Sequence, residues 1–440
     1  IIIVSLLRMA INRIRQLLGS DFSKSLSILL SGTIIAQAVG YLIAPILTRL
    51  YTTAEMGELG LYMRLTGFIA AIATLRYEAA LPLPKLDGHS FLLYRLSYRI
   101  SFIVLMIVSA VFLFIMSSGL ADSFSWWFYT FTILGAACIV IVNIGTSWSV
   151  RIGQYGIISR QKITNSSVSN ALKWAFAYFH FSTFGLILAT FLGSFISSIE
   201  FSLHFGKLHQ KFKQFISKRK TAVLMRKHKE FPILNLPHVF VDNGRDMLIA
   251  TFIFAYYSES VYGSFNHSYT MLRLPLTLVG ISLGQLFYNR ASELYNSGKS
   301  MVPLLNKMLL ALSALSIIPF SLLFFYGEPL FAFVFGKDWG LSGSYSETMS
   351  VWLMINFILS PIAALPLILR KQKVFFFMGI VSSFIQVLPF WYFPWKYGKT
   401  QEVFHTSLQV VSYTQASWLI VSIIVFYSYA VQASREKIRS

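Results

Sequence analysis

The chain has 440 residues, of which 55% are hydrophobic and only 12% are charged, and its mean hydropathy is +0.63. Because about a quarter of the residues of a typical soluble domain are charged, this composition excludes an ordinary soluble enzyme and indicates a protein that crosses a membrane many times. The single cysteine, Cys138, lies in an apolar run, which excludes an internal disulfide and a thiolate metal cluster.

Apolar runs of the length that a bilayer core requires, about 20 residues, recur along the chain. The sequence therefore predicts an all-α polytopic membrane protein with about 12 transmembrane helices. The preceding residues 1–24 carry Arg8, Arg13 and Arg15 and are predicted to form a cytoplasmic amphipathic lead-in. The predicted spans are residues 26–48, 57–81, 96–118, 126–148, 164–182, 184–206, 233–257, 260–287, 302–326, 346–369, 374–393 and 405–430.

The basic residues are distributed unevenly between the two sides of the predicted membrane. With the N-terminus inside, the cytoplasmic stretches hold 28 of the 37 Lys and Arg residues, and the outer loops hold 4. This asymmetry follows the positive-inside rule and places both termini in the cytoplasm. The net charge of +20 is therefore topological. A nucleic-acid partner is not expected, because no basic face with interleaved aromatic residues lies outside the loops.

The longest connection, residues 207–232, is strongly basic and divides the predicted spans into six and six. We therefore predict an N-lobe (25–206), a basic cytoplasmic linker that faces membrane lipids, a C-lobe (233–430) and a cytoplasmic tail (431–440). Six spans bring the chain back to the same side, so the halves would be parallel repeats. The segments "LYTTAEMGELGLYMRL" and "YYSESVYGSFNHSYTMLRL" can be aligned with Gly57 over Gly263.

The sequence has no complete motif for nucleotide or metal chemistry. "NSGKS" at residues 296–300 resembles the end of a phosphate-binding loop, but Glu293 stands where that loop requires a glycine, which excludes direct use of ATP. His238 and His267 fall within predicted spans, where a packed, hydrogen-bonded imidazole is a more common role than a proton relay. We therefore expect no metal and no cofactor.

Four arginines lie inside predicted spans: Arg64, Arg76, Arg245 and Arg273. Each costs about 2.5–3.5 kcal/mol at the centre of a lipid-facing helix, so each must face a partner or water. Guanidinium groups at this depth suit an anionic cargo, because they bind phosphate oxygens bidentately. Lys173 is a fifth buried cation, although near the membrane edge its ammonium group can reach the surface.

Internal ion pairing is the alternative role for two of these arginines. Asp242 and Asp246 stand near Arg245 in the sequence, and Glu78 neighbours Arg76. Arg64 and Arg273 have no carboxylate within one turn of their own helices, which favours a functional role. We predict that Arg64, Arg245 and Arg273, with Lys173, line a cavity at mid-membrane depth.

Several segments resemble the Wzx-type oligosaccharide flippases of the multidrug/oligosaccharidyl-lipid/polysaccharide (MOP) exporter superfamily. They are "SGTIIAQAVGYLIAPILTRLYTTAEMGELGLY", "IATLRYEAALPLPK", "FPILNLPHVFVDNGRDMLIATFI" and "VFGKDWGLSGSYSETMSVWLMINFILSPI". The resemblance implies two six-helix lobes in a V around a basic cavity, as in multidrug and toxin exporters. The family's motif arginines correspond to Arg49 and Arg76, and its seventh-span polar run to residues 242–246. The family often has a proline where this chain has Thr53.

The resemblance implies a flippase for undecaprenyl-pyrophosphate-linked oligosaccharide repeat units in the bacterial inner membrane. Its product would feed O-antigen or other surface polysaccharide synthesis, with a downstream polymerase and a chain-length regulator as partners. Without a nucleotide site, the energy would come from a proton or sodium gradient or from consumption of the product. Asp242, Asp246 and Glu78 are the candidates for ion coupling.

Two other classes of protein remain as alternatives. A cation or drug antiporter of the same superfamily would need acidic residues in its cavity, and the excess of buried arginine disfavours it. A membrane polysaccharide polymerase or ligase would need a sizeable outer loop. The largest outer loop predicted here, residues 327–345, is short for that role.

Overall fold

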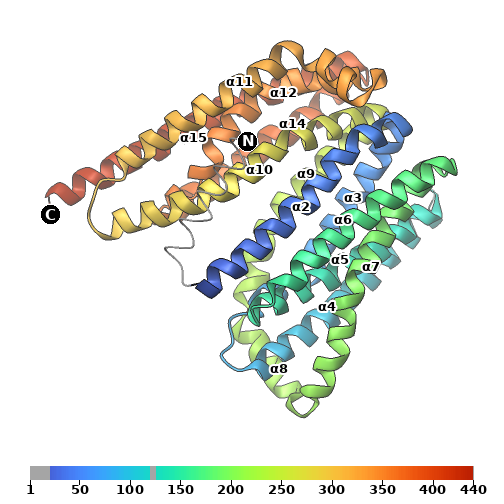
Figure 1. The fold of residues 1–440 in the computed structure, drawn as a ribbon, viewed down its shortest axis with the longest axis vertical. Helices are drawn as coiled ribbons and strands as arrows, with labels where there is room; N and C mark the ends of the chain where they lie inside the picture. Colours follow the sequence, from blue (N-terminus) through green and yellow to red (C-terminus); the bar gives the residue numbers. More distant parts are fainter. Residues whose placement is uncertain (1–19, 119–124, 440) are drawn as a thin grey trace. The chain divides into compact units, whose positions relative to one another are not determined.

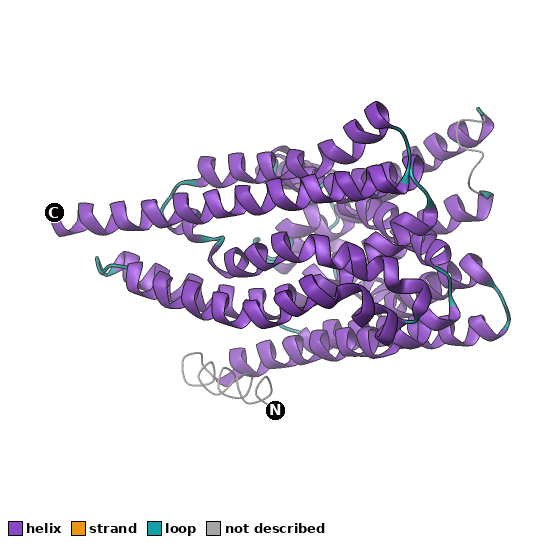
Figure 2. Ribbon diagram, turned by 90° about the horizontal axis from the view of Figure 1, so that it is seen from above, coloured by secondary structure: helices purple, strands orange, loops and turns teal. Residues whose placement is uncertain are grey.

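A computed structural model describes residues 20–118 and 125–439 of the chain. The described residues are helical apart from short turns, and they contain no β-strand (Figure 2). Most of the predicted N-terminal lead-in, residues 1–19, lies outside the described part, so that prediction is untested. The all-α fold class is confirmed.

Each predicted span overlaps one long helix (Figure 1). The helices of the first half are α2 (Ser20–Leu50), α3 (Thr53–Ala73), α4 (Asp87–Ser117), α5 (Trp126–Arg151), α6 (Tyr155–Tyr178), α7 (Ser182–Lys211) and the short α8 (Lys218–Lys227). Those of the second half are α9 (Leu236–Tyr256), α10 (Glu259–Asn296), α11 (Val302–Phe335), α12 (Gly340–Leu359), the short α13 (Leu365–Ile368), α14 (Gln372–Tyr397) and α15 (Gln401–Arg439).

Eight helical segments of the described chain are long and apolar enough to cross a membrane. These segments involve α2, α4, α5, α7, α11, α12, α14 and α15. The other four predicted spans form α3, α6, α9 and α10, which have 21, 24, 21 and 38 residues and are not among these eight segments. These four helices are the ones that carry Arg64, Lys173, Arg245 and Arg273.

Local sequence signals determine where several helices begin and end. Thr52 and Glu55 form a reciprocal capping box at the start of α3: the Thr52 amide donates to the Glu55 carboxylate at 2.7 Å, and the Glu55 amide donates to Thr52 Oγ1 at 3.3 Å. Ser258 caps α10 by accepting the Val261 amide at 3.1 Å. The predicted span 57–81 is too long, because α3 ends at Ala73.

The chain folds into two compact units. The first comprises residues 1–50 and 62–244, and the second comprises residues 51–61 and 245–440. Helix α3 therefore begins in the second unit and continues in the first, whereas α9 begins in the first and continues in the second. The predicted lobes were defined by membrane spans rather than by compactness, and their boundaries stay a prediction.

Aromatic side chains form much of the core in both units. In the first unit, Tyr94 and Trp148 pack edge to face at 5.5 Å between ring centroids, and Leu224 of the linker helix α8 joins the same hydrophobic cluster. In the second unit, the Phe404 ring lies 4.9 Å from that of Tyr345 and 5.7 Å from that of Phe390. Apolar burial thus ties the linker helix to the first unit.

Within the second unit, the first turns of α3 cross α10 in backbone contact at Gly57 and Gly263. A Cβ atom at either glycine would lie 3.0 Å from the amide nitrogen of the other. It would lie closer still to a carbonyl oxygen one turn earlier on the facing helix, that of Glu259 for Gly57 and that of Thr53 for Gly263. The contact is reciprocal, and it joins the two positions that the sequence alignment paired.

Candidate functional site

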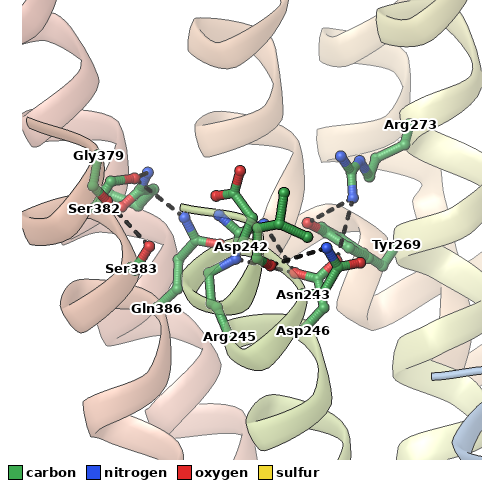
Figure 3. Close-up of polar contacts among 12 residues, drawn as sticks. Asp242, Asn243, Arg245, Asp246, Tyr269, Arg273, Gly379, Ser382, Ser383 and Gln386 are labelled. Atoms are coloured by element: carbon green, nitrogen blue, oxygen red, sulfur yellow. Dashed lines mark hydrogen bonds and ion pairs between the residues drawn. The ribbon is translucent and has the colours of Figure 1, made fainter. Parts of the chain in front are cut away.

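Helices α9 and α10 bring Arg245, Asp246 and Arg273 together in the second unit (Figure 3). The Arg245 guanidinium binds Asp246 Oδ1 through Nη2 at 2.9 Å and through Nε at 3.0 Å. Arg273 Nη1 lies 3.9 Å from the other oxygen of the same carboxylate, Asp246 Oδ2. One carboxylate therefore serves two guanidinium groups. We call these three residues the charge triad, and its formal charge is +1.

The structure shows Arg245 in an ion pair, as the ion-pairing alternative predicted. The adjacent Asp246 is a carboxylate partner of Arg245. Asp242 lies with Oδ2 3.7 Å from Nδ1 of His238, and both of those side chains are more than half exposed. Arg273 also has a carboxylate partner. That partner comes from α9, so the spacing along α10 could not predict it.

Tyr269 holds Arg273 from one turn earlier on α10 (Figure 3). Arg273 Nη1 donates a hydrogen bond to Tyr269 Oη at 3.2 Å, and the guanidinium carbon lies 5.0 Å from the centre of the Tyr269 ring. This arrangement combines a hydrogen bond with a cation–π contact. One face of the Tyr269 ring is therefore occupied by Arg273.

The three triad side chains differ in exposure. That of Arg273 is 39% exposed, whereas those of Arg245 and Asp246 are 19% and 18% exposed. Arg273 is therefore the member that an incoming anion can reach most easily. Arg245 is the more enclosed of the two arginines and is the more tightly bound to Asp246.

A buried amide cluster on α14 and α15 was not predicted from the sequence. Ser382 Oγ accepts hydrogen bonds from Gln386 Nε2 at 3.2 Å and from Gln415 Nε2 at 2.6 Å, and both glutamines are buried. Figure 3 shows the α14 residues on one side of α9, with Arg273 and Tyr269 on the other. The sequence feature that could have indicated this cluster is Gln386 in an otherwise apolar run, with Ser382 one turn earlier on the same helix.

Arg76 lies in a second polar cluster, in the first unit. It follows α3 in a left-handed turn, with φ of 48° at Leu75 and 63° at Arg76. Arg76 Nη1 binds Glu78 Oε1 at 2.8 Å, and its Nε donates to Asn235 Oδ1 at 3.0 Å. Glu78 is buried and also accepts a short hydrogen bond from Thr74 Oγ1. The ion-pairing alternative holds for Arg76, which ties the end of α3 to the residues before α9.

The other predicted cations also lie in the first unit. Arg49 is exposed in the last turn of α2, where its charge is favourable to the helix dipole. Arg64 on α3 and Lys173 on α6 are each half-buried. Because the triad belongs to the second unit, a shared cavity that joins it to Arg64 and Lys173 stays a prediction. Within the described residues, no group of three His, Cys, Asp or Glu side chains is arranged to hold a metal ion.

Comparison with known proteins finds one family. A family model described as "Polysaccharide biosynthesis protein" matches residues 46–342. No curated protein matches the sequence.

Several solved transporters have the same fold. The lipid II flippase MurJ in an inward closed conformation has a TM-score of 0.68 at 16% identity, over 93% of this chain and 91% of that one. A multidrug resistance MATE family transporter of the MOP superfamily, in an inward-facing conformation, has a TM-score of 0.57 at 13% identity, over 94% and 95%. A MOP superfamily transporter from Pyrococcus furiosus has a TM-score of 0.54 at 14% identity, over 95% and 97%. The fold is that of the MOP superfamily, and the chain is a multi-pass membrane protein.

Proposed function

The chain belongs to the polysaccharide biosynthesis protein family and has the MOP transporter fold, and on this basis we propose that it is a flippase for lipid-linked oligosaccharides. Its cargo would be an undecaprenyl-pyrophosphate-linked repeat unit, moved from the cytoplasmic to the outer leaflet of the bacterial inner membrane. The product would serve O-antigen or another surface polysaccharide. One protein with this fold is itself named a lipid II flippase, which supports a lipid-linked cargo.

The observation that carries the proposal is the charge triad. Two arginines on helices predicted to span the membrane contact one carboxylate, and these three side chains together have a formal charge of +1. A pyrophosphate suits such a site, because each guanidinium presents planar paired donors to phosphate oxygens. A cation antiporter would instead need an excess of acidic groups. The net positive charge therefore favours an anionic cargo over a cationic drug.

Transport would proceed by alternating access, as in other repeat-built transporters. Coupling to a proton or sodium gradient would use a carboxylate, and the three candidates differ in surroundings. Asp246 contacts both triad arginines, Glu78 is buried against Arg76, and Asp242 is exposed beside His238. Asp246 is the best placed of the three to link an ion to the cargo.

The test replaces the accessible arginine of the triad. Arg273→Gln should abolish surface-glycan assembly and cause lipid-linked single repeat units to accumulate on the cytoplasmic leaflet. Arg290→Gln on the same helix is the matched control, because Arg290 is more than half exposed and pairs with Glu293 one turn away. That control should retain glycan assembly. Full assembly with Arg273→Gln, at a normal protein level, would refute the proposed role.

A further inference from the structure

The two arginines of the charge triad are bound to Asp246 unequally. Arg245 makes two contacts to one carboxylate oxygen, at 2.9 and 3.0 Å. Arg273 lies 3.9 Å from the other oxygen, which is beyond hydrogen-bond distance, and Nη1 donates instead to Tyr269 at 3.2 Å. A guanidinium has five N–H donors. Arg273 is the most accessible member of the triad and is positioned by the Tyr269 hydroxyl, and its other donors can bind a second anion.

Asp246 also has a reason to be present when no cargo is bound. Two guanidinium groups at membrane depth without a counter-ion would repel each other and would be costly to desolvate. The Asp246 carboxylate removes that cost by making one strong contact and one weak contact. A phosphate that enters the site presents the same kind of oxygen to the same donors as Asp246 does.

We propose that Asp246 is an internal substitute for the cargo's phosphate: it holds both arginines before binding and gives up Arg273 when a phosphate arrives. This inference rests on the proposed function, because it assigns the anion at that site. Arg245 keeps its contact with Asp246 throughout. Arg273 turns from Asp246 to the phosphate and keeps its contact with the Tyr269 ring. Asp246 is thus a positioning residue. By competing for Arg273, it weakens the binding of the cargo's phosphate enough for the cargo to leave on the far side of the membrane.

If Asp246 competes with the phosphate for Arg273, removing its charge should strengthen phosphate binding, whereas a purely structural Asp246 would weaken binding or leave it unchanged when replaced. The test measures binding of inorganic pyrophosphate to the purified full-length protein. Asp246→Asn removes the competing charge and keeps the side-chain shape, so the affinity should rise by roughly tenfold or more, the size of effect that one charge at about 4–6 Å has on a neighbouring ionised group. Asp246→Glu keeps the charge and should bind pyrophosphate much as the unchanged protein does. An unchanged or lower affinity in a folded Asp246→Asn protein would overturn the inference.

A second variant keeps the test decisive if Asp246→Asn fails to fold. Tyr269→Phe keeps the ring but removes the hydroxyl that draws Arg273 away from Asp246. Arg273 should then move closer to the carboxylate, and pyrophosphate affinity should fall several-fold. An unchanged affinity in Tyr269→Phe would count against the competition.

Arg273→Gln separates this inference from the proposed function. If Arg273→Gln leaves pyrophosphate affinity unchanged, the triad is not the phosphate site and the proposed function loses its support. If Arg273→Gln weakens binding but Asp246→Asn does not strengthen it, only the competition is refuted. Both effects together, with normal thermal stability in each variant, are the expected result.

Discussion

Adding one methyl group at Gly57 should disrupt the crossing of α3 and α10. In Gly57→Ala, the new Cβ would lie 3.0 Å from the Gly263 nitrogen and closer to the Glu259 carbonyl oxygen. Both are backbone atoms, so no side-chain rotation relieves the overlap and the helices must separate. Overpacking of this kind costs about 1–3 kcal/mol. That cost exceeds the roughly 0.8–1 kcal/mol that alanine gains over glycine in a helix.

The same helix supplies a matched control. A Cβ at Gly67, ten residues further along α3, would meet nothing within 4 Å. Gly67→Ala should therefore gain helix propensity and leave stability equal or higher. Thermal unfolding of the full-length protein in detergent, followed by intrinsic tryptophan fluorescence, measures both variants. The surface-glycan assay then shows whether the separation of α3 and α10 also impairs transport.

The reciprocal contact allows a stricter version of this experiment. Gly263→Ala should destabilise as Gly57→Ala does, because each new methyl group meets the backbone of the other helix. The double variant should cost less than the sum of the two, since one separation of the helices relieves both overlaps. If Gly57→Ala is as stable as Gly67→Ala, the close backbone approach is refuted.

Two further predictions concern the first unit. Glu78→Gln leaves Arg76 without its carboxylate partner and should lower the free energy of unfolding by about 1–3 kcal/mol. The loss is smaller than for a fully buried pair because the Arg76 side chain is 27% exposed. Equal denaturation midpoints for the variant and the unchanged protein would contradict this prediction. Leu224→Ala should cost about 2–5 kcal/mol by creating a cavity under α8, whereas Val223→Ala, at a 59% exposed neighbour, should cost almost nothing. Comparable losses in those two variants would show that α8 is not anchored through Leu224.

Hydropathy predicted the positions of the long helices because an apolar run must be helical in lipid. The predicted ends were less accurate, since they depend on local backbone conformation. The span predicted to reach residue 81 stops at Ala73, where the left-handed residues Leu75 and Arg76 end α3. The capping box at Thr52 and Glu55 was readable in the sequence, and it starts α3 four residues before the predicted span.

The candidate site was harder to predict because its contacts join different helices. Sequence spacing identified Arg245, Asp246 and Arg273 separately, and it identified the Arg245 and Asp246 pair because those residues are neighbours. It could not supply the Arg273 contact, since the partner carboxylate lies 27 positions away on another helix. The hydrogen bond between Arg76 and Asn235 joins residues 159 positions apart and could not be predicted from the sequence either. Pairing between helices is a property of the fold.

The four helices that carry Arg64, Lys173, Arg245 and Arg273 connect these observations. A charged side chain gains nothing from facing lipid, so α3, α6, α9 and α10 should place these positions against protein or water. On α9 and α10 those charges meet in the triad, with one carboxylate for two arginines. A purely structural network would be expected to balance its charges, because an excess charge at that depth is destabilising. The triad itself has a formal charge of +1, which the anionic cargo of the proposed function would neutralise.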